Sequence, residues 1–289
     1  MSCKRRRINQ QRWTIKKKRS QGRRNWLDLP TDVMLLIFIK LGVVELLANA
    51  QKVCSLWKKL AKEPLLYRSI DFQGSERYTT NAENCSKYAR FQLAMLAKEA
   101  VDRSCGQLVK LSTTRGSCWD RIFCYVNSTN SLKSLKLRGW LFMSEHDLAH
   151  VVGGLDSLEE LDMDWVYFPD FTIGELSRTC QKLTSFRLRV GMVFGKTSDN
   201  ALSVMAKNLP QLHRLTLEGF LITNKGLQTI LEGFPRLEHL DLQQCSLDKV
   251  LHKKNLLMKC ATKIKSVIPP SGRVSKDNHL GVVRRVVGS

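Results

Sequence analysis

The sequence of 289 residues lacks a long hydrophobic segment. Its longest unbroken apolar run covers only residues 33–39, whereas a helix that spans a membrane needs about 20 apolar residues. The N-terminus is basic, but no apolar segment follows it, so we expect no secretory signal. The sequence therefore predicts a protein that is not integral to a membrane.

Closely spaced cysteines and the common catalytic motifs are also missing. The nine cysteines are an odd number and none forms a CxxC pair, which argues against a disulfide framework and against a zinc ribbon. No cysteine has a histidine beside it to activate it as a nucleophile. Glycine-rich phosphate loops, GxSxG elbows and kinase motifs are absent. We expect no catalysis, no cofactor, no metal and a reducing compartment.

One pair of histidines has the spacing of a metal site. His146 and His150 stand four residues apart with Asp147 between them, a pattern similar to the HExxH motif of zinc proteases. Asp is one methylene shorter than Glu, so it would place a general base wrongly, and Leu148 is a packing residue in the same stretch. We expect an exposed helical face here, and a metallohydrolase is the weakest alternative.

The formal net charge of +21 is concentrated at the two ends of the chain. Residues 1–24 hold eleven Lys or Arg and no acid, and residues 249–289 hold ten Lys or Arg and one acid. Residues 25–248 hold 26 basic and 25 acidic residues, so this part is nearly neutral. This part has no stretch in which basic residues alternate with aromatic ones, as they do in grooves that bind a nucleic-acid backbone and stack its bases. A nuclear nucleic-acid-associated protein that uses its basic tails is the alternative function.

The N-terminal tail has two basic clusters, which ten residues separate. This is the spacing of a two-part nuclear import signal. Like charges at this density repel one another, so we expect residues 1–24 to be a disordered, solvated tail. A working import signal and a non-specific polyanion-binding tail both stay open, and we expect the protein in the nucleus, the cytoplasm or both. The signal residues are Lys4, Arg5, Lys16, Lys17, Lys18 and Arg19.

Residues 25–72 predict a short helical unit with too much apolar surface for its size. Pro30 suits a first helical turn, Asp32 places negative charge at the positive end of the helix, and Gly42 suits the C-cap. Residues 33–39 make this first helix apolar on every side, whereas a surface helix shows one apolar stripe. Leu46, Ala50, Val53, Trp57 and Leu60 follow at helical steps of three and four. About 45 residues cannot cover so much apolar surface, so the rest of the chain or another protein must.

This unit resembles an F-box, the motif that binds the small Skp-type adaptor of an SCF ubiquitin ligase. The matching positions include Leu29-Pro30, the acid Asp32 and Leu46. Tyr67 departs from the pattern, because many F-boxes carry Trp there. The resemblance implies that the adaptor supplies the missing cover, with some matching residues facing it and others packing within the motif. For Val53 and Cys54, core packing is an equal alternative. The implied adaptor-binding residues are Leu29, Pro30, Ile37, Leu41, Val53, Cys54 and Trp57.

A repeated LxxLxL pattern fills most of the second half of the chain. It occurs six times at intervals of 24 to 29 residues, and single positions are replaced by Phe, Met or Thr. The segments between repeats, such as 199–206 and 225–231, have a helix-like pattern. Each unit offers a strand and a helix that cannot bury its apolar face alone, so the units must stack. The repeats begin at Leu108, Leu132, Leu158, Leu183, Leu212 and Leu237.

This half resembles a leucine-rich-repeat solenoid, and residues 25–250 together resemble plant F-box/leucine-rich-repeat proteins of the Skp-interacting-partner class. We expect an α+β chain in two parts, a three-helix F-box followed by an α/β leucine-rich-repeat solenoid of about six degenerate repeats. The resemblance implies a non-catalytic subunit that binds the Skp-type adaptor, through it a cullin, and a target protein. The expected division is a basic tail at 1–24, the F-box at 25–72, the repeats at 73–250 and an unassigned basic segment at 251–289.

Strand residues that alternate with the leucines are expected to point outward from a concave wall. One strand carries only acids there, between two strands that carry paired basic residues. Because parallel strands lie about 4.8 Å apart, Asp162 can pair with Lys136 or Arg187. Alternatively, the face binds a charged segment of a target, and changing Asp162 and Asp164 to Lys would then abolish capture without affecting folding. The charged positions are Lys136, Arg138, Glu160, Asp162, Asp164, Arg187, Arg189, Glu218 and Asp241.

Overall fold

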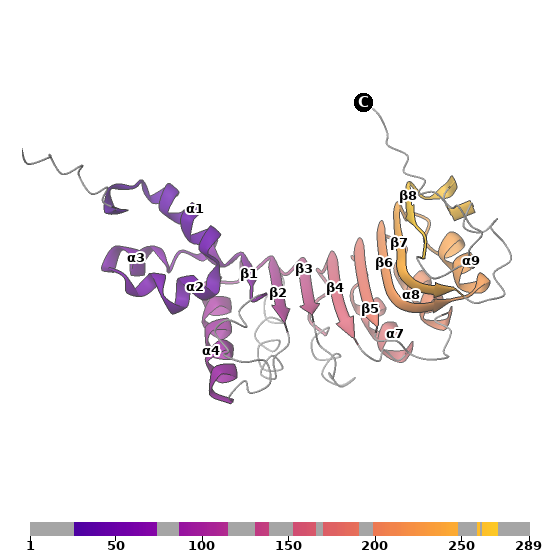
Figure 1. The fold of residues 1–289 in the computed structure, drawn as a ribbon, viewed down its shortest axis with the longest axis horizontal. Coiled ribbons are helices and arrows are strands. Elements are labelled where there is room, and N and C mark those ends of the chain that lie inside the picture. The colour runs from indigo at the N-terminus through magenta and orange to yellow at the C-terminus, as the bar shows by residue number, and fades with distance from the viewer. Residues whose placement is uncertain are drawn as a thin grey trace, which may run out of the picture.

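A helical module at one end of the molecule leads into an arc of parallel strands (Figure 1). The computed structural model describes residues 26–73, 87–114, 131–138, 153–165, 170–190, 199–247, 259–260 and 262–270. We call residues 26–73 the helical module. The arc contains one sheet of eight described strands, and its order in space follows the order in the chain from β1 to β8.

The helical module begins with the apolar helix that the sequence predicts. Helix α1 spans Thr31–Leu41, and Pro30 stands just before its first residue, not within its first turn. Gly42 ends the helix as expected, with a φ of +82°, a left-handed conformation that glycine adopts without strain. Helix α2, Val43–Ala48, follows immediately. No single helix among the described residues is long and apolar enough to cross a bilayer, although α1 and Val43–Lys52, bent by 109°, reach that length and composition together.

The second apolar series of the module is divided between several short helices. After α2, a 3-10 turn covers Ala50–Lys52 and helix α3 covers Ser55–Leu60. Cys54 separates them because its backbone is extended and its Sγ accepts the N–H of Trp57 at 3.5 Å. The thiol thus acts as the N-cap of α3, in the role that Ser or Asp usually fills.

The module ends in the first strand of the sheet. A 3-10 turn at Trp26–Asp28 opens the module, and another at Pro64–Tyr67 precedes strand β1, Ser69–Asp71. Helix α4, Lys87–Arg103, packs against α2 and the second of these turns. Because β1 pairs with β2, the module continues directly into the solenoid.

The sheet contains all six strands that the LxxLxL pattern predicts. They are β2 (Lys110–Thr114), β3 (Ser134–Arg138), β4 (Glu160–Trp165), β5 (Ser185–Val190), β6 (Arg214–Ile222) and β7 (His239–Leu247). Every neighbouring pair is parallel. Two more strands extend the arc, β1 within the helical module and β8 (Ser266–Ile268) within the C-terminal segment that the sequence left unassigned.

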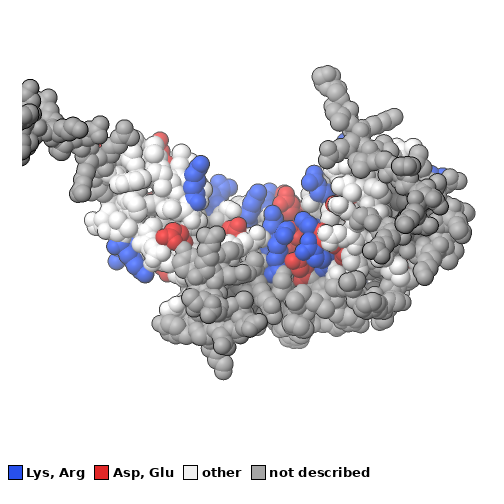
Figure 2. Space-filling view, viewed as in Figure 1, with Lys and Arg blue, Asp and Glu red and all other residues white. Residues whose placement is uncertain are grey.

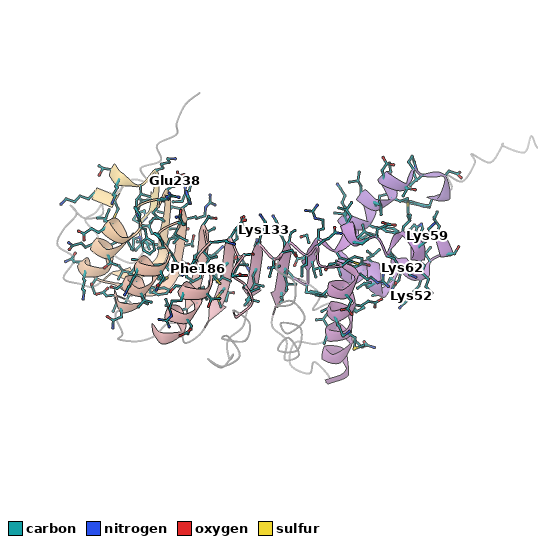
Figure 3. All side chains as sticks on the ribbon, turned by 180° about the vertical axis from the view of Figure 1, so that it is seen from behind. Lys52, Lys59, Lys62, Lys133, Phe186 and Glu238 are labelled. Atoms are coloured by element: carbon teal, nitrogen blue, oxygen red, sulfur yellow. The ribbon has the colours of Figure 1, made fainter. Side chains whose placement is uncertain are left out.

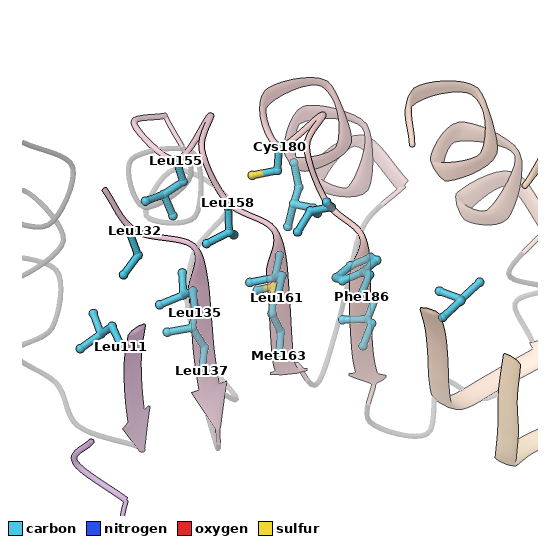
Figure 4. Close-up of a cluster of buried hydrophobic side chains, with 14 of the residues drawn as sticks. Leu111, Leu132, Leu135, Leu137, Leu155, Leu158, Leu161, Met163, Cys180 and Phe186 are labelled. Atoms are coloured by element: carbon cyan, nitrogen blue, oxygen red, sulfur yellow. The ribbon is translucent and has the colours of Figure 1, made fainter. Parts of the chain in front are cut away.

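The leucines of the repeats form a ladder on one side of this sheet (Figure 4). Leu111, Leu135, Leu161 and Phe186 are register partners on successive strands, and each is almost fully buried. Truncating one such side chain to Ala costs about 2–5 kcal/mol. Stacking of the strands therefore provides the core that no single repeat can form.

Helices cover the apolar side of the sheet. Helices α7 (Asp170–Thr179), α8 (Asp199–Asn208) and α9 (Asn224–Gly233) pack side by side, and α8 and α9 confirm the two predicted helical segments. Thr223 caps α9 by accepting the N–H groups of Lys225 and Gly226. The opposite side of the sheet is therefore left open as the concave face of the arc (Figure 1).

Candidate functional sites

The first candidate site is an exposed apolar surface on the helical module. Helix α1 buries Met34 and Phe38, each only 1% exposed, against the rest of the module. Its other side leaves Leu36 59% and Ile39 48% exposed, and Val33 and Leu41 are also exposed. Neither the module nor the solenoid covers these side chains among the residues that the structure describes. The apolar character of α1 on every side is thus only half explained by packing within the chain.

Most of the large exposed apolar side chains lie on this module. Ten such residues are exposed in the described part of the chain, and eight of them belong to residues 26–73. Val53 is 63% exposed, and Leu56 on α3 and Leu65 in the last 3-10 turn are exposed as well. A concentration of this kind is typical of surfaces that contact another molecule, which makes the module a candidate binding site.

The structure divides the predicted adaptor-binding residues into two groups. Pro30, Leu41 and Val53 are exposed, so they are available to a partner. The other residues serve the module itself, because Leu29, Ile37 and Trp57 pack on its core and Cys54 caps α3. The ring of Trp57 meets that of Phe38 edge-on, with centroids 5.3 Å apart.

Several exposed apolar residues were not among those predicted. Motif matching selected positions by resemblance and passed over Val33, Leu36, Ile39, Leu56 and Leu65. The helical period could have found those on α1, because Met34 and Phe38 stand four residues apart and define the inward side. Once that side is known, apolar residues on the opposite part of α1, such as Leu36, are expected to be exposed.

Lysines accompany the apolar residues on the module. Lys52, Lys59 and Lys62 are exposed there (Figure 3), and so is Lys58. A partner that covers this part of the surface would need to bring acidic groups with it.

A half-buried arginine joins the helical module to the solenoid. Arg103, at the end of α4, donates from Nη1 to the carbonyl of Ala61 at 2.9 Å and to the hydroxyl of Tyr67 at 3.0 Å. Its Nη2 donates to Gln51 and to Glu99 at 2.9 and 2.5 Å. Groups from the Ala50–Lys52 turn, the end of α3, the Pro64–Tyr67 turn and α4 thus meet at one guanidinium. Sequence reasoning missed this junction, because Arg103 lies outside both motifs.

Tyr67 uses its hydroxyl within this junction. The residue is fully buried, and its hydroxyl donates to the carbonyl of Ala61 at 2.5 Å while it accepts from Arg103. Burial raises the pKa of Tyr67 despite the opposing effect of Arg103. The departure from the Trp found in many F-boxes is therefore matched by a specific set of hydrogen bonds in this chain.

The second candidate site is the concave face, where charges of both signs gather in the hollow of the arc (Figure 2). Arg138 bridges to Asp162 at 2.9 Å. Arg189 bridges to Asp164 at 3.7 Å and to Glu218 at 2.5 Å, and Arg187 reaches the other oxygen of Glu218. We call these six residues the charged network.

Glu218 is the most buried member of the charged network. It is only 5% exposed, although the alternation of strand residues predicted that it points outward to solvent. Burial alone would raise the pKa of Glu218, but hydrogen bonds from Arg189 and Arg187 outweigh that effect and hold its pKa below the ordinary value. Glu218 is thus an ionised, structurally bound carboxylate.

The ion pair of Asp162 differs from the expected one. Lys136 and Arg187 stand directly opposite Asp162 in the register of the sheet, yet the ion pair forms with Arg138, which reaches it diagonally from β3. Arg187 is engaged by Glu218 instead. Changing Asp162 and Asp164 to Lys would place two new cations against Arg138 and Arg189, so we now expect this double change to lower the stability of the fold as well.

The remaining charged positions of the predicted face lie outside the charged network. Lys136 on β3 and Glu160 on β4 are exposed. Asp241 on β7 is half-buried and accepts the backbone N–H of Gln243 at 2.9 Å. The predicted face therefore contains the charged network in its middle, and around it charged residues that form no ion pair with the described part of the chain.

The described residues include no group of three or more His, Cys, Asp or Glu that could hold a metal ion. His146 and His150 lie outside the described residues, as do all the residues of the predicted import signal. Burial raises the pKa of Cys180 and Cys245 to about 12 and that of Cys260 to about 11. These three thiols are therefore protonated packing residues at neutral pH.

Fold and surfaces together define a class of protein. A small helical module with an exposed apolar surface, followed by an arc of stacked parallel strands, is the architecture of a helical unit joined to a repeat solenoid. Comparison with known families agrees with this description, because the F-box-like family matches residues 26–73.

Individual relatives extend the match beyond the helical module. The putative F-box/LRR-repeat protein 23 of Arabidopsis thaliana is 33% identical over 77% of this chain, and the chain spans about half of that relative, 48% of its length. The F-box protein FBW2 of the same plant is 30% identical over 77% of this chain and 68% of its own length. An internalin from Listeria monocytogenes has a TM-score of 0.30 and 13% identity, over 57% of this chain and 62% of its own. The chain belongs to the plant F-box/leucine-rich-repeat proteins.

Proposed function

We propose that the chain is a substrate-recognition subunit of an SCF-type ubiquitin ligase. The helical module binds the Skp-type adaptor, the adaptor links it to the cullin, and the repeats hold a target protein. Membership in the F-box/leucine-rich-repeat proteins supports this role. The observation that carries the proposal is the apolar side of α1, which none of the described residues covers and which an outside partner would bury.

The exposed residues of α1 can supply substantial binding free energy. Full burial of a Leu or Ile side chain contributes about 1.5–3 kcal/mol. Leu36 and Ile39 are about half exposed, so covering each of them would contribute roughly 1 kcal/mol. These two positions are therefore the most direct place to weaken the interface without disturbing the module.

In this proposal the chain itself does no chemistry. Other subunits of the ligase transfer ubiquitin, and this chain contributes by holding a target close to them in a fixed orientation. The junction at Arg103 supports such a role, because it ties the adaptor-binding module to the solenoid that would carry the target.

Affinity capture with variants of α1 tests the proposal. Changing Leu36 and Ile39 together to Asp should remove the Skp-type adaptor and the cullin from the captured proteins. The matched control changes Met95 on α4 and Ile268 on β8 to Asp, two apolar residues that are 51% and 42% exposed and lie outside α1. The control should retain both partners. Retention of the adaptor by the α1 variant would contradict the proposal.

We also propose that residues 1–24 direct the protein to the nucleus. The two basic clusters in this tail support the proposal. A fluorescent fusion that lacks residues 1–24 should then leave the nucleus, and an unchanged distribution would reject the signal.

The alternative function is that of a nuclear nucleic-acid-associated protein. It is favoured by the charge of the two tails, which carry almost the whole excess of +21. It predicts nucleic-acid binding that weakens with salt, survives the α1 changes and vanishes when the tails are removed.

A further inference from the structure

The first three strands, together with the residues that precede them, carry a surplus of basic residues. Counting β1, β2 and β3 together with the residue before each strand, there are five Lys or Arg and one acid. Two of the five are already engaged, because Lys133 bridges to Glu159 at 2.8 Å and Arg138 bridges to Asp162. The other three have no ion-pair partner in the part of the chain that the structure describes. We call them the basic stripe: Arg68, Lys110 and Lys136.

The members of the basic stripe follow one diagonal across the strands. Arg68 precedes β1, and its carbonyl accepts the N–H of Lys110, the first residue of β2, at 3.0 Å. Lys136 lies on β3, two residues beyond Ser134, which is the register partner of Lys110. Strands about 4.8 Å apart with a rise of about 3.3 Å per residue place the Cα atoms of Lys110 and Lys136 about 8 Å apart. All three side chains are exposed.

Acidic residues border the basic stripe and make it narrow. Asp71 on β1 accepts the backbone N–H of Gln73 at 2.7 Å, and Glu160 on β4 is the register partner of Ser134. Beyond Glu160, the charged network neutralises its own acids and arginines. Among the described residues of β1 to β3, the uncompensated positive charge therefore lies chiefly on the basic stripe. A bound segment would meet it there.

We propose that the basic stripe binds an extended, acidic segment of the target protein, beside the helical module. Carboxylates two residues apart in an extended chain are about 7 Å apart, which matches the separation of the two lysines. Ammonium groups on flexible stems suit such point contacts with separate carboxylates. This inference rests on the proposed function, because it names the chemistry of the target that the repeats hold.

Peptide binding to the full chain tests the inference. The probe is a fluorescent twelve-residue peptide of alternating Glu and Ser, and a Lys-Ser peptide serves as the probe control. The variant changes Lys110 and Lys136 to Glu. The matched control changes Lys207 on α8 and Lys225 on α9 to Glu, which are exposed residues on the helical side of the sheet. Both variants have the same net charge and both basic tails, so general attraction is equal in them.

The expected result is a loss that depends on position. The Glu-Ser peptide should bind the Lys110/Lys136 variant at least about tenfold more weakly, and the control within about twofold of the unaltered chain. Changing the same two lysines to Arg should preserve binding, and added salt should weaken it. Equal losses in both Glu variants, or no loss in either, would overturn the inference. The inference would also be overturned if the Lys110/Lys136 changes weakened the binding of a single-stranded oligonucleotide but not the binding of the peptide.

Capture of the Skp-type adaptor by the same preparations separates this inference from the proposed function. If the unaltered chain captures the adaptor but the Lys110/Lys136 changes do not weaken peptide binding, only the present inference fails. If the peptide binds through the stripe but no adaptor is captured, the proposed function fails and the stripe stands as a binding site for acidic segments.

Discussion

At the scale of single residues, the length and charge of a side chain determine its ion-pair partner, and the sequence pattern does not. The charged residues of β3–β6 alternate with leucines as expected, but alternation alone cannot tell which charges pair. The long side chain of Arg138 reaches Asp162 diagonally, while two arginines share Glu218. Such choices depend on side-chain reach and on competition between neighbours, so strand register alone predicted the wrong partner for Asp162.

Glu218→Gln should lower the free energy of unfolding by about 1–3 kcal/mol at pH 7, because two arginines lose their ionised acceptor. The folded state lowers the pKa of Glu218 from 4.5. Its stabilising effect is therefore present above the unfolded pKa and is lost as the pH falls through the folded pKa. Urea unfolding at pH 7 and at acid pH should show the difference between variant and parent shrinking in acid. A difference that grows in acid would contradict this assignment.

At the scale of the element, the strands with complete LxxLxL patterns were predictable and the short ones were not. Repeated leucines at a regular interval identified β2 to β7. Strands β1 and β8 have three residues each and contribute only Ile70 and Val267 as register partners of the ladder. A single apolar residue cannot show a repeating pattern. These two strands can therefore be recognised only from their pairing with a neighbouring strand in the structure.

Short helices were hard to predict for a related reason. The apolar steps from Leu46 to Leu60 fit a helix, but they carry no sign of the extended residue Cys54. Cysteine is not among the usual N-caps, so its place before α3 gave no warning. Helix α1 was predicted better because Asp32 and Gly42 mark its two ends.

Strand β6 contains a glycine that its neighbour makes necessary. Gly219 has a φ of +81°, and an added Cβ would lie 2.1 Å from the carbonyl oxygen of Val190 on β5. Gly219→Ala should therefore lower the free energy of unfolding by at least about 2 kcal/mol, from both left-handed strain and the clash. Thermal unfolding measures the change.

Gly106 provides the matched control for that change. It has a similar φ of +75°, but nothing lies within 4 Å of an added Cβ. Gly106→Ala should cost only the conformational strain, about 1 kcal/mol. Equal losses at both glycines would show that contact with β5 is unimportant.

At the scale of the whole molecule, the contacts around Arg103 and the pairing of β1 with β2 hold the two surfaces in one frame. Arg103→Ala would leave the carbonyl of Ala61 and the hydroxyl of Tyr67 without this donor. We expect a loss of about 2–4 kcal/mol in the free energy of unfolding and faster proteolysis between module and solenoid. Arg103→Lys should not restore stability, because one ammonium cannot reproduce the planar fork.

The control for the junction is an exposed ion pair of the same type. Arg178 pairs with Glu175 on the surface of α7, with both side chains about half exposed. Arg178→Ala should cost less than about 1 kcal/mol. If Arg103→Ala proved equally mild, the two parts of the molecule would not depend on this residue for their attachment.

The position of β1 has a consequence for dividing the protein. The family match at residues 26–73 includes this strand, yet the strand pairs with β2 from Ser69 to Asp71. A fragment that begins after residue 73 would bare the backbone of β2 as an open edge, where a second copy could add its own strand. Exchanging this F-box for another would also replace strand β1. The chimeric protein should therefore fold only when the new F-box supplies a strand that can pair with β2.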